Sequence, residues 1–244
     1  MYLVDCDVVA GFWPKSRIPM SPKEMGALLS RNGIKEAFVV SARGILFDHQ
    51  RGNEETLQWA EASKNPNTFG VQFHPVGTID LRRFLGYREE IHRYSQAGVR
   101  LWRLFPEYQG WDFEHPAFRR VADAVAGVGG TLFVKGKAGR VLSGLKGCPV
   151  KLIIGTHFYD LSEVFALWEE GQKFALSMAQ FHGPGTLRIV LDQGGRGRIV
   201  FGSGAPFFSP SAVVGVLEGS DLSEEERQAI SGVTLRNLLE KDPW

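Results

Sequence analysis

The sequence predicts an α/β protein in which eight strands, each followed by a helix, close into one (β/α)8 barrel. Short apolar, β-branched runs alternate with amphipathic segments at intervals of roughly 20 to 40 residues. The runs are mostly apolar on both faces, as expected for parallel strands covered by helices. The chain has 244 residues, close to the roughly 250 typical of this fold. No linker divides it, so residues 1–244 are expected to form a single barrel domain.

The strands are predicted from their composition and from the turn residues that bound them. The first run contains two carboxylates and is closed by Gly11 and Pro14. The expected strands are Tyr2–Val9, Glu36–Ser41, Thr68–His74, Val99–Phe105, Thr131–Lys135, Lys151–Ile154, Lys173–Met178 and Arg198–Phe201.

The helices are predicted from capping residues and apolar spacing. Ser21-Pro22-Lys23-Glu24 places a capping serine, a proline and an early acid before Met25, and Gly33 ends that helix. An extra C-terminal helical segment over Ser223–Glu240 starts with the capping pattern Ser223-Glu224-Glu225-Glu226. Further helices are expected at Asn53–Ser63, Leu81–Gln96, Ala117–Val128, Leu161–Glu170 and Pro210–Gly219.

A doubly wound open sheet is the rival architecture. Such sheets carry a glycine-rich phosphate loop after the first strand, where this chain has Asp5-Cys6-Asp7. The glycines of Gly194-Gly195-Arg196-Gly197 precede a strand, which is the wrong side for a phosphate loop. The closed barrel is therefore favoured.

Composition excludes several classes of function. The balance of 28 basic and 27 acidic residues gives no field that would attract nucleic acid. No apolar run approaches the roughly 18 residues of a membrane span, and no signal peptide is visible, so a cytoplasmic location is expected. Cys6 and Cys148 cannot form a disulfide framework or a zinc clip. The expected ligand is a small molecule.

In a (β/α)8 barrel the chemistry lies at the carboxyl ends of the strands, so polar residues there are the candidates for a site. Charged groups at the ends of buried strands are costly unless they are paired or face a wet pocket. The candidates singled out are Asp5, Asp7, Arg43, His74, Arg103, Tyr108, Lys135, Lys137, His157 and His182.

Several phrases occur in an order and spacing that carry a resemblance. They are Arg51-Gly52-Asn53-Glu54-Glu55, His74-Pro75, Gly98-Val99-Arg100, Leu104-Phe105-Pro106-Glu107-Tyr108, Lys151-Leu152-Ile153-Ile154-Gly155 and Ile199-Val200-Phe201-Gly202-Ser203-Gly204-Ala205-Pro206. Across nearly the whole chain these resemble the amidohydrolase-related family (amidohydrolase 2 type) of metal-dependent TIM-barrel hydrolases and decarboxylases. The resemblance implies the barrel fold and, in the family, a divalent metal.

The resemblance also implies metal ligands, and this chain departs from them. The first strand of the family reads Asp-x-His-x-His, and the two histidine positions fall on Asp7 and Val9. The later ligand positions fall on Lys135, Thr156 and Gly204, and His157 comes one residue after Thr156. Because Asp7 alone of these is a good ligand at neutral pH, we expect a degenerate site with no metal and no other cofactor.

We hypothesise that Lys135 replaces the metal. Its ammonium is expected to approach Asp7 across the barrel mouth and to neutralise that carboxylate. Lys135 then acts either in a structural ion pair with Asp7 or Asp5, or as a catalytic amine that forms a Schiff base, with Asp7 as its partner. His157 and His182 are candidate proton carriers.

The other candidates are assigned to substrate binding, each with a structural alternative. Arg43, Arg103 and Lys137 could hold an anion, although Arg103 could instead pair with Glu107 or Asp7. Asp5 could instead accept hydrogen bonds from loop amides, and His74 could be a packed histidine. Tyr108 is one of several aromatic residues expected to line an apolar pocket.

Three functions remain open, and the sequence does not decide whether the chain is an enzyme. The first is a non-catalytic homologue, a pseudoenzyme with a binding or regulatory role, which forms a homodimer or pairs with an intact metal-dependent relative. The second is a metal-independent hydrolase or decarboxylase (lyase) that acts on a small carboxylate through Lys135. The third keeps residual metal binding and hydrolase activity of the family type.

Overall fold

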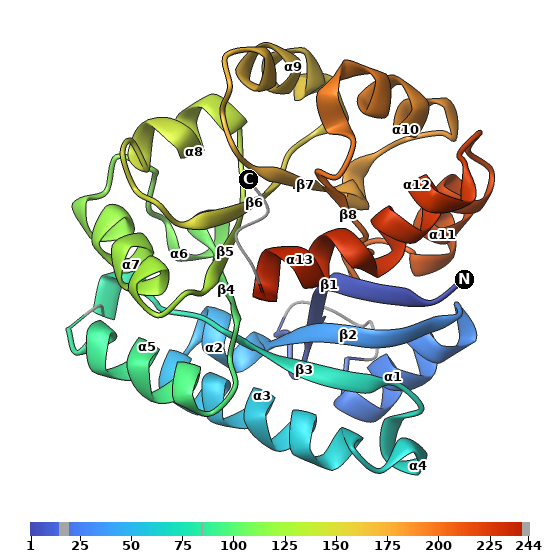
Figure 1. Cartoon of the computed structure of the whole chain (residues 1–244). Coiled ribbons are helices and arrows are strands. Elements are labelled where there is room, and N and C mark those ends of the chain that lie inside the picture. Colours follow the sequence, from blue (N-terminus) through green and yellow to red (C-terminus); the bar gives the residue numbers. More distant parts are fainter. Residues whose placement is uncertain (15–19, 84, 241–244) are drawn as a thin grey trace.

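The predicted (β/α)8 barrel is confirmed. The computed structural model describes residues 1–14, 20–83 and 85–240. Eight parallel strands pair in chain order from β1 to β8 (Figure 1). The ring closes because the amide of Cys6 donates to the carbonyl of Phe201 at 3.0 Å and that of Val9 to Ala205 at 2.9 Å.

The elements alternate along the chain as expected. The strands are β1 (Leu3–Ala10), β2 (Ile34–Ser41), β3 (Gln72–Gly77), β4 (Leu101–Leu104), β5 (Thr131–Lys135), β6 (Lys151–Gly155), β7 (Ala175–Ser177) and β8 (Ile199–Val200). The helices are α1 (Pro22–Arg31), α2 (Ala42–Leu46), α3 (His49–Ser63), α4 (Pro66–Phe69), α5 (Tyr87–Gln96), α6 (Pro106–Gln109), α7 (Pro116–Gly127), α8 (Ala138–Gly144), α9 (Leu161–Glu169), α10 (Gly185–Val190), α11 (Pro210–Glu218), α12 (Glu224–Gln228) and α13 (Thr234–Glu240). Shorter helical segments are η1 (Leu81–Arg83), η2 (Phe158–Asp160), η3 (Met178–Gln180), η4 (Leu191–Gly195) and η5 (Ala229–Val233).

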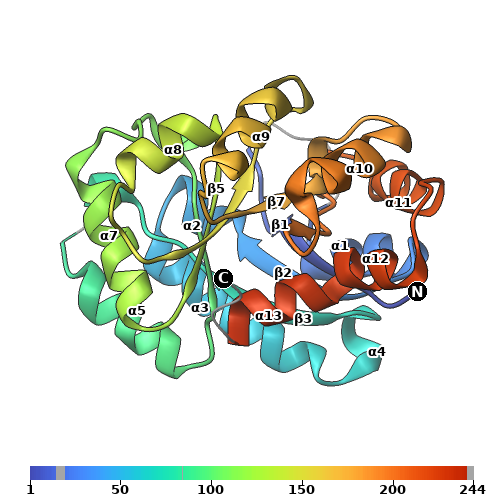
Figure 2. The ribbon, with the colours of Figure 1, turned by 45° about the horizontal axis from the view of Figure 1, so that its top comes forward.

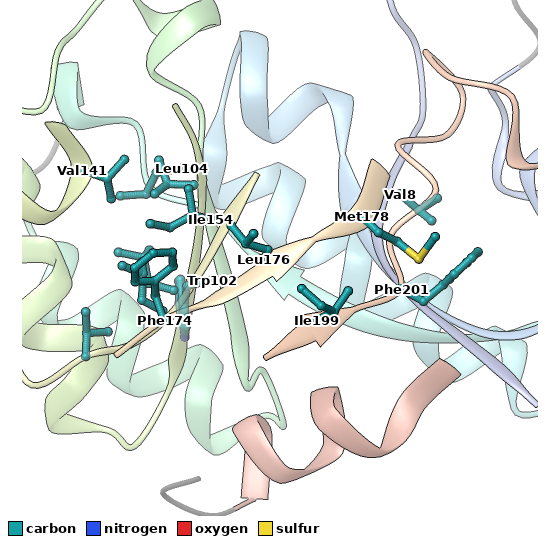
Figure 3. Close-up of a cluster of buried hydrophobic side chains, with 14 of the residues drawn as sticks. Val8, Trp102, Leu104, Val141, Ile154, Phe174, Leu176, Met178, Ile199 and Phe201 are labelled. Atoms are coloured by element: carbon teal, nitrogen blue, oxygen red, sulfur yellow. The ribbon is translucent and has the colours of Figure 1, made fainter. Parts of the chain in front are cut away.

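Successive side chains of each strand point to opposite faces of the sheet, so the strands contribute to two separate apolar layers. In β5, Leu132 and Val134 belong to the layer between strands and helices, whereas Phe133 belongs to the barrel interior. Figure 3 shows the outer layer, where Leu104 and Ile154 of the strands lie near Val141 of α8. Fully burying one such side chain is worth about 1.5–3 kcal/mol, so the two layers supply much of the stability of the barrel.

Both predicted capping patterns start helices. The Ser21 hydroxyl accepts a hydrogen bond from the amide of Glu24 at 3.3 Å, and the Glu24 carboxylate accepts one from the amide of Ser21 at 3.0 Å. Ser223 and Glu226 form the same reciprocal arrangement at the start of α12. Each cap satisfies amides that the first helical turn leaves free.

Several expected boundaries differ from those in the structure, and two of the differences have a clear physical cause. The strand expected over Thr68–His74 begins only at Gln72, because Asn65 caps the helical turn α4 and Gly70 ends it with a φ of 74°. The helix expected over Leu81–Gln96 is divided into η1 and α5, and Gly86 precedes α5 in the left-handed region with a φ of 79°.

The predicted C-terminal helix covers the amino end of the barrel. Leu235 and Leu238 of α13 belong to the interior cluster, and the Thr131 hydroxyl at the start of β5 donates to the carbonyl of Leu238 at 3.0 Å. Figures 1 and 2 both show this red helix along one end of the strand ring. The carboxyl ends of the strands therefore form the other end, which we call the mouth.

None of the helices in the described part of the chain combines the length and the apolarity that a membrane-spanning segment requires.

Candidate functional site

The strand period places two cations inside the barrel near its mouth. In β4 the interior residues Leu101 and Phe105 flank Arg103, and in β5 Lys135 follows the interior residue Phe133 by two positions. The guanidinium of Arg103 lies over the rings of Phe105 and Phe133, with its Cζ 4.7 and 4.8 Å from their centroids. These rings fix the guanidinium by cation–π contacts.

A register shift in β1 places a carboxylate opposite these cations. The pairing of β1 with β2 is irregular between Asp5 and Val8, and regular alternation resumes with Val9 in the interior. Such an irregularity changes the direction in which local side chains point. It places Asp7 inside the barrel, against β4 and β5.

Asp7 forms ion pairs with both cations. Its Oδ1 lies 2.6 Å from Arg103 Nη1 and its Oδ2 lies 2.9 Å from Lys135 Nζ. The side chains of Asp7 and Arg103 are 1% and 5% exposed, and that of Lys135 is 22% exposed. The predicted approach of Lys135 to Asp7 is therefore confirmed, and so is the pairing of Arg103 with Asp7. We call these three residues the charge cluster.

The charges of this cluster determine how Asp7 titrates. Burial by itself would raise the pKa of Asp7, but the neighbouring charges of Arg103 and Lys135 outweigh it and lower that pKa. Asp7 is therefore ionised at neutral pH. Within these three residues two cations face one carboxylate, the carboxyl of Asp5 lies beside them, and Lys135 is the member that reaches solvent.

Asp5 is fully buried and ties β1 to the chain after β8. Its Oδ1 accepts hydrogen bonds from the amides of Asp7 at 3.0 Å and Ser203 at 2.9 Å. Burial raises the pKa of Asp5 to about 6, which these hydrogen bonds only partly oppose. Burial also raises the pKa of the neighbouring Cys6 thiol well above its usual value, so this thiol is not a nucleophile.

Two glycines make room for the charge cluster. A Cβ added to Gly155 would lie 2.8 Å from Lys135 Cγ and 3.2 Å from Phe133 Cε2, so the lysine stem crosses the face of Gly155. A Cβ added to Gly202 would lie 2.4 Å from Ser177 Oγ and 3.1 Å from Asp7 Cβ. Both positions therefore require the absence of a side chain.

A pocket of about 440 Å³ opens at the mouth above the charge cluster. Its walls combine charged groups with aromatic rings. They are formed by Val9, Arg103, Phe105, Glu107, Tyr108, Lys135, Gly136, Lys137, Gly155, Thr156, His157, Asp160, Gln180, Phe207 and Phe208. We call it the mouth pocket. Its volume suits a small ligand of about the size of a substituted benzene ring.

The aromatic wall comes from three separate segments. The ring of Trp13 packs edge-on against Tyr108 at 4.9 Å and against Phe207 at 4.8 Å. The ammonium of Lys135 lies 5.8 Å from the centroid of Phe208. A planar apolar group can therefore contact rings while its charged end reaches Lys135.

Groups that could carry protons also line the mouth pocket. Burial by surrounding protein raises the pKa of the Glu107 carboxyl, although this side chain still reaches solvent at the pocket edge. His157 lines the pocket as well, and its ring lies 6.3 Å from that of His182, which does not belong to the lining. Lys137 lies at the rim, where its Nζ is 3.7 Å from Asp160.

Six of the ten candidates from the sequence meet at this site. They are Asp7, Arg103, Tyr108, Lys135, Lys137 and His157. Asp5 is buried beside them with backbone partners, and His182 lies next to His157. The catalytic and binding roles assigned to these residues stay predictions.

The position expected for His74 is wrong, and Arg43 follows β2 as expected but lies outside the mouth pocket. Because β3 starts later than expected, His74 lies toward the amino end of the barrel, where its Nε2 is 2.7 Å from Glu36. Arg43 follows β2 but lines a different pocket, and its Nε is 2.8 Å from Glu55. Neither side chain reaches the mouth pocket.

Sequence reasoning missed three residues of the mouth pocket. Phe207 and Phe208 follow the phrase that ends in Ala205-Pro206, and Asp160 follows His157 by three positions. The only signal was their place after a predicted strand, which many loop residues share.

The donor set at the mouth does not fit a divalent metal ion. No group of three or more His, Cys, Asp or Glu side chains within residues 1–14, 20–83 and 85–240 could hold one. Asp7 already contacts two cations. At Gly204, φ is +69° and an added Cβ would lie 2.4 Å from Phe208 Cδ2, so no carboxylate could be placed there without displacing that ring.

Comparison with known proteins identifies the fold. No protein-family model matches the sequence, and no curated protein matches it either. Solved structures do match. A 5-carboxyvanillate decarboxylase from Sphingomonas paucimobilis has a TM-score of 0.71 at 12% identity, over 99% of each chain.

Two further decarboxylases are similar over their whole length. A 2,6-dihydroxybenzoate decarboxylase in complex with 2,6-dihydroxybenzoate has a TM-score of 0.73 at 13% identity, over 98% of this chain and 99% of that one. A dihydroxybenzoic acid decarboxylase from a Polaromonas species, with bound manganese and 2-nitroresorcinol, has a TM-score of 0.69 at 14% identity, over 98% and 97%. The resemblance seen in the sequence is thus confirmed at the level of the fold.

Proposed function

We propose that this chain is a metal-independent decarboxylase, or a related lyase, that acts on a small carboxylic acid bound in the mouth pocket. The charge cluster carries this proposal, because it places one partly exposed ammonium at the base of a pocket with aromatic walls. Three structures with the same fold are described as decarboxylases of carboxylated phenols. At 12–14% identity this likeness supports the reaction type only by analogy.

In the proposed reaction Lys135 acts as a fixed charge. The bond between the carboxyl carbon and the adjacent substrate carbon breaks, carbon dioxide leaves, and the electron pair stays on the substrate. The ammonium of Lys135 stabilises the negative charge that develops there. Asp7 and Arg103 hold the ammonium in place, so it does not have to reorganise during the step.

A proton must then reach the substrate carbon. Glu107 and His157 both line the pocket and are the candidate donors. The raised pKa of Glu107 allows this carboxyl to hold a proton closer to neutral pH than an ordinary glutamate.

The geometry favours electrostatic stabilisation over a Schiff base. Lys135 Nζ lies 2.9 Å from the Asp7 carboxylate, and an ammonium in such an ion pair has no free electron pair for attack on a carbonyl. Borohydride treatment in the presence of small oxo acids checks this point. A trapped adduct on Lys135 would show that the amine acts covalently.

The proposal is tested with protein freed of metal by a chelator. We would measure carbon dioxide release from 5-carboxyvanillate, 2,6-dihydroxybenzoate and a panel of small oxo acids. Turnover of at least one acid should survive chelation and be lost in Lys135→Met. The matched control Lys64→Met, whose side chain is 67% exposed and does not belong to the lining of the mouth pocket, should retain most activity. Activity that disappears on chelation and returns with manganese would refute the proposal.

The same experiment identifies the second candidate function. The poor fit of the donor set to a metal favours a binding or regulatory homologue that has lost the family chemistry. Such a protein would bind an acid from the panel without turnover. A metal-loaded relative that copurifies with it would support a regulatory pairing.

A further inference from the structure

Thr156 presents a buried hydroxyl without a hydrogen-bond partner at the wall of the mouth pocket. The residue is 2% exposed, and within the described ranges nothing is bonded to its Oγ1. The buried hydroxyl of Ser41, at the end of β2, is by contrast paired and donates to Glu55 at 2.6 Å. An unpaired buried hydroxyl costs the free protein folding free energy. A ligand that forms a hydrogen bond with this hydroxyl removes the cost and therefore binds more tightly.

The position of Thr156 relates it to the charge cluster. Lys135 pairs with Gly155 in the ladder between β5 and β6, and the amide of Gly136 donates to the carbonyl of Gly155 at 2.9 Å. The two strands therefore stay joined up to the mouth, and Thr156 is the next residue. Neighbouring strands are about 4.8 Å apart, so one small ligand can contact donors on both.

We infer that Thr156 is a specificity-determining residue of the mouth pocket, whose hydroxyl hydrogen bonds to an oxygen of the ligand adjacent to the carboxylate that Lys135 attracts. This inference rests on the proposed function, because it assumes that an acid occupies the pocket. A hydroxyl both donates and accepts, so either a hydroxyl or a keto oxygen of the ligand is suitable. Rotation about χ1 gives the hydroxyl three staggered directions and can turn it toward the bound acid.

The ligand pair mandelate and phenylacetate isolates this contact. The two acids share a ring and a carboxylate and differ by one hydroxyl next to the carboxylate. We would measure Kd for each by calorimetry, using the full-length, chelator-treated protein at pH 7.

The decisive variant is Thr156→Val, which keeps the shape of the side chain and removes its hydroxyl. We expect mandelate to bind about tenfold more weakly, since a hydrogen bond to a ligand oxygen is worth roughly that factor in an equilibrium constant. Phenylacetate should bind as before. Thr156→Ser should restore the preference for mandelate.

Thr78 provides a matched control. Thr78 is 0% exposed, and its Oγ1 also lacks a hydrogen-bond partner within the described residues. It directly follows β3 and does not belong to the lining of the mouth pocket. Thr78→Val therefore removes a comparable hydroxyl from the core. It should leave both Kd values within twofold, whereas a general effect of losing a buried hydroxyl would appear in both variants.

The outcomes separate this inference from the proposed function. If Thr156→Val changes the affinity for mandelate less than twofold while Lys135→Met abolishes binding, the inference is overturned and the proposed function stands. If Thr156→Val weakens mandelate binding and Lys135→Met does not, the inference holds and the role of Lys135 fails. If neither acid binds the wild-type protein at millimolar concentration, the inference is overturned, and the turnover assay with the panel of acids decides the proposed function.

Discussion

Replacement of Asp7 by asparagine tests how the charge cluster contributes to folding. The substitution keeps the size of the side chain and removes its charge. Arg103, whose side chain is 5% exposed, then keeps a buried positive charge with no carboxylate at 2.6 Å. Lys135, at 22% exposure, can recover part of its hydration. The loss should therefore come mainly from Arg103.

The size of the loss of folding free energy in Asp7→Asn follows from the burial of Arg103. Removing one partner of a buried ion pair costs about 3–5 kcal/mol, because the other charge stays buried without compensation. For a chain of this size each kcal/mol lowers Tm by about 2–4 °C, so Asp7→Asn should lower Tm by roughly 6–20 °C. Lys135→Met removes the more hydrated partner and leaves the pair of Asp7 with Arg103 intact, so it should cost only about 1 kcal/mol.

Urea and thermal unfolding at pH 7 measure these differences. The double variant Asp7→Asn, Arg103→Met also removes the buried guanidinium that Asp7→Asn leaves without a carboxylate. It should be more stable than Asp7→Asn alone, since apolar replacement of a buried ion pair is often neutral or favourable. The folded-state pKa of Asp7 is lowered, so its stabilisation is present above its unfolded pKa and is lost as pH falls. The deficit of Asp7→Asn should therefore shrink below about pH 4. A variant within about 0.5 kcal/mol of wild type at pH 7, a small effect even for a surface substitution, would refute this reasoning.

Three further predictions concern other parts of the barrel. Asp5 has a pKa raised to about 6, so the folded state holds its proton more tightly and stability falls as pH rises from about 4 to 6. In wild type this carboxyl should lower the free energy of unfolding by roughly 3 kcal/mol between pH 4 and pH 7, and Asp5→Asn should abolish that decrease. Denaturant unfolding at the two pH values measures it, and an unchanged pH profile would contradict the burial argument. Gly155→Ala should displace the Lys135 stem and weaken acid binding at least tenfold with a smaller loss of Tm than Asp7→Asn, and wild-type affinity would show that the stem does not need this space. His74→Ala should leave acid affinity and turnover unchanged, because His74 pairs with Glu36 at the far end of the barrel; loss of binding would place this end in the site.

Much of the fold could be predicted because its signals are local. The strand Thr131–Lys135 has the same bounds in the structure as in the prediction, since a β-branched and aromatic run between glycines leaves little alternative. The helices after Ser21 and Ser223 begin where capping serines and glutamates three residues later require them. The contact of Lys135 with Asp7 was also predicted, because both residues fall at ligand positions of the resembled family.

The errors arose where a local signal competed with a tertiary one. The apolar run before His74 contains residues of the turn α4, so counting from the run placed the strand too early and the histidine at the wrong end. Arg43 follows a strand, as a site residue should, but it forms an ion pair with Glu55 of α3. Both residues line a pocket other than the mouth pocket.

The sequence by itself determined the number and order of the strands, the parallel barrel and the presence of a set of charged residues near the strand ends. These depend on composition, on the period of two and on capping, all of which act over a few residues. Only the tertiary structure decided that the irregular pairing in β1 places Asp7 between Arg103 and Lys135, that Gly155 and Gly202 leave space for them, and that Phe208 fills the space beside Gly204. Those outcomes depend on close packing between segments far apart in the chain, where a shift of one residue or one added carbon changes which groups meet.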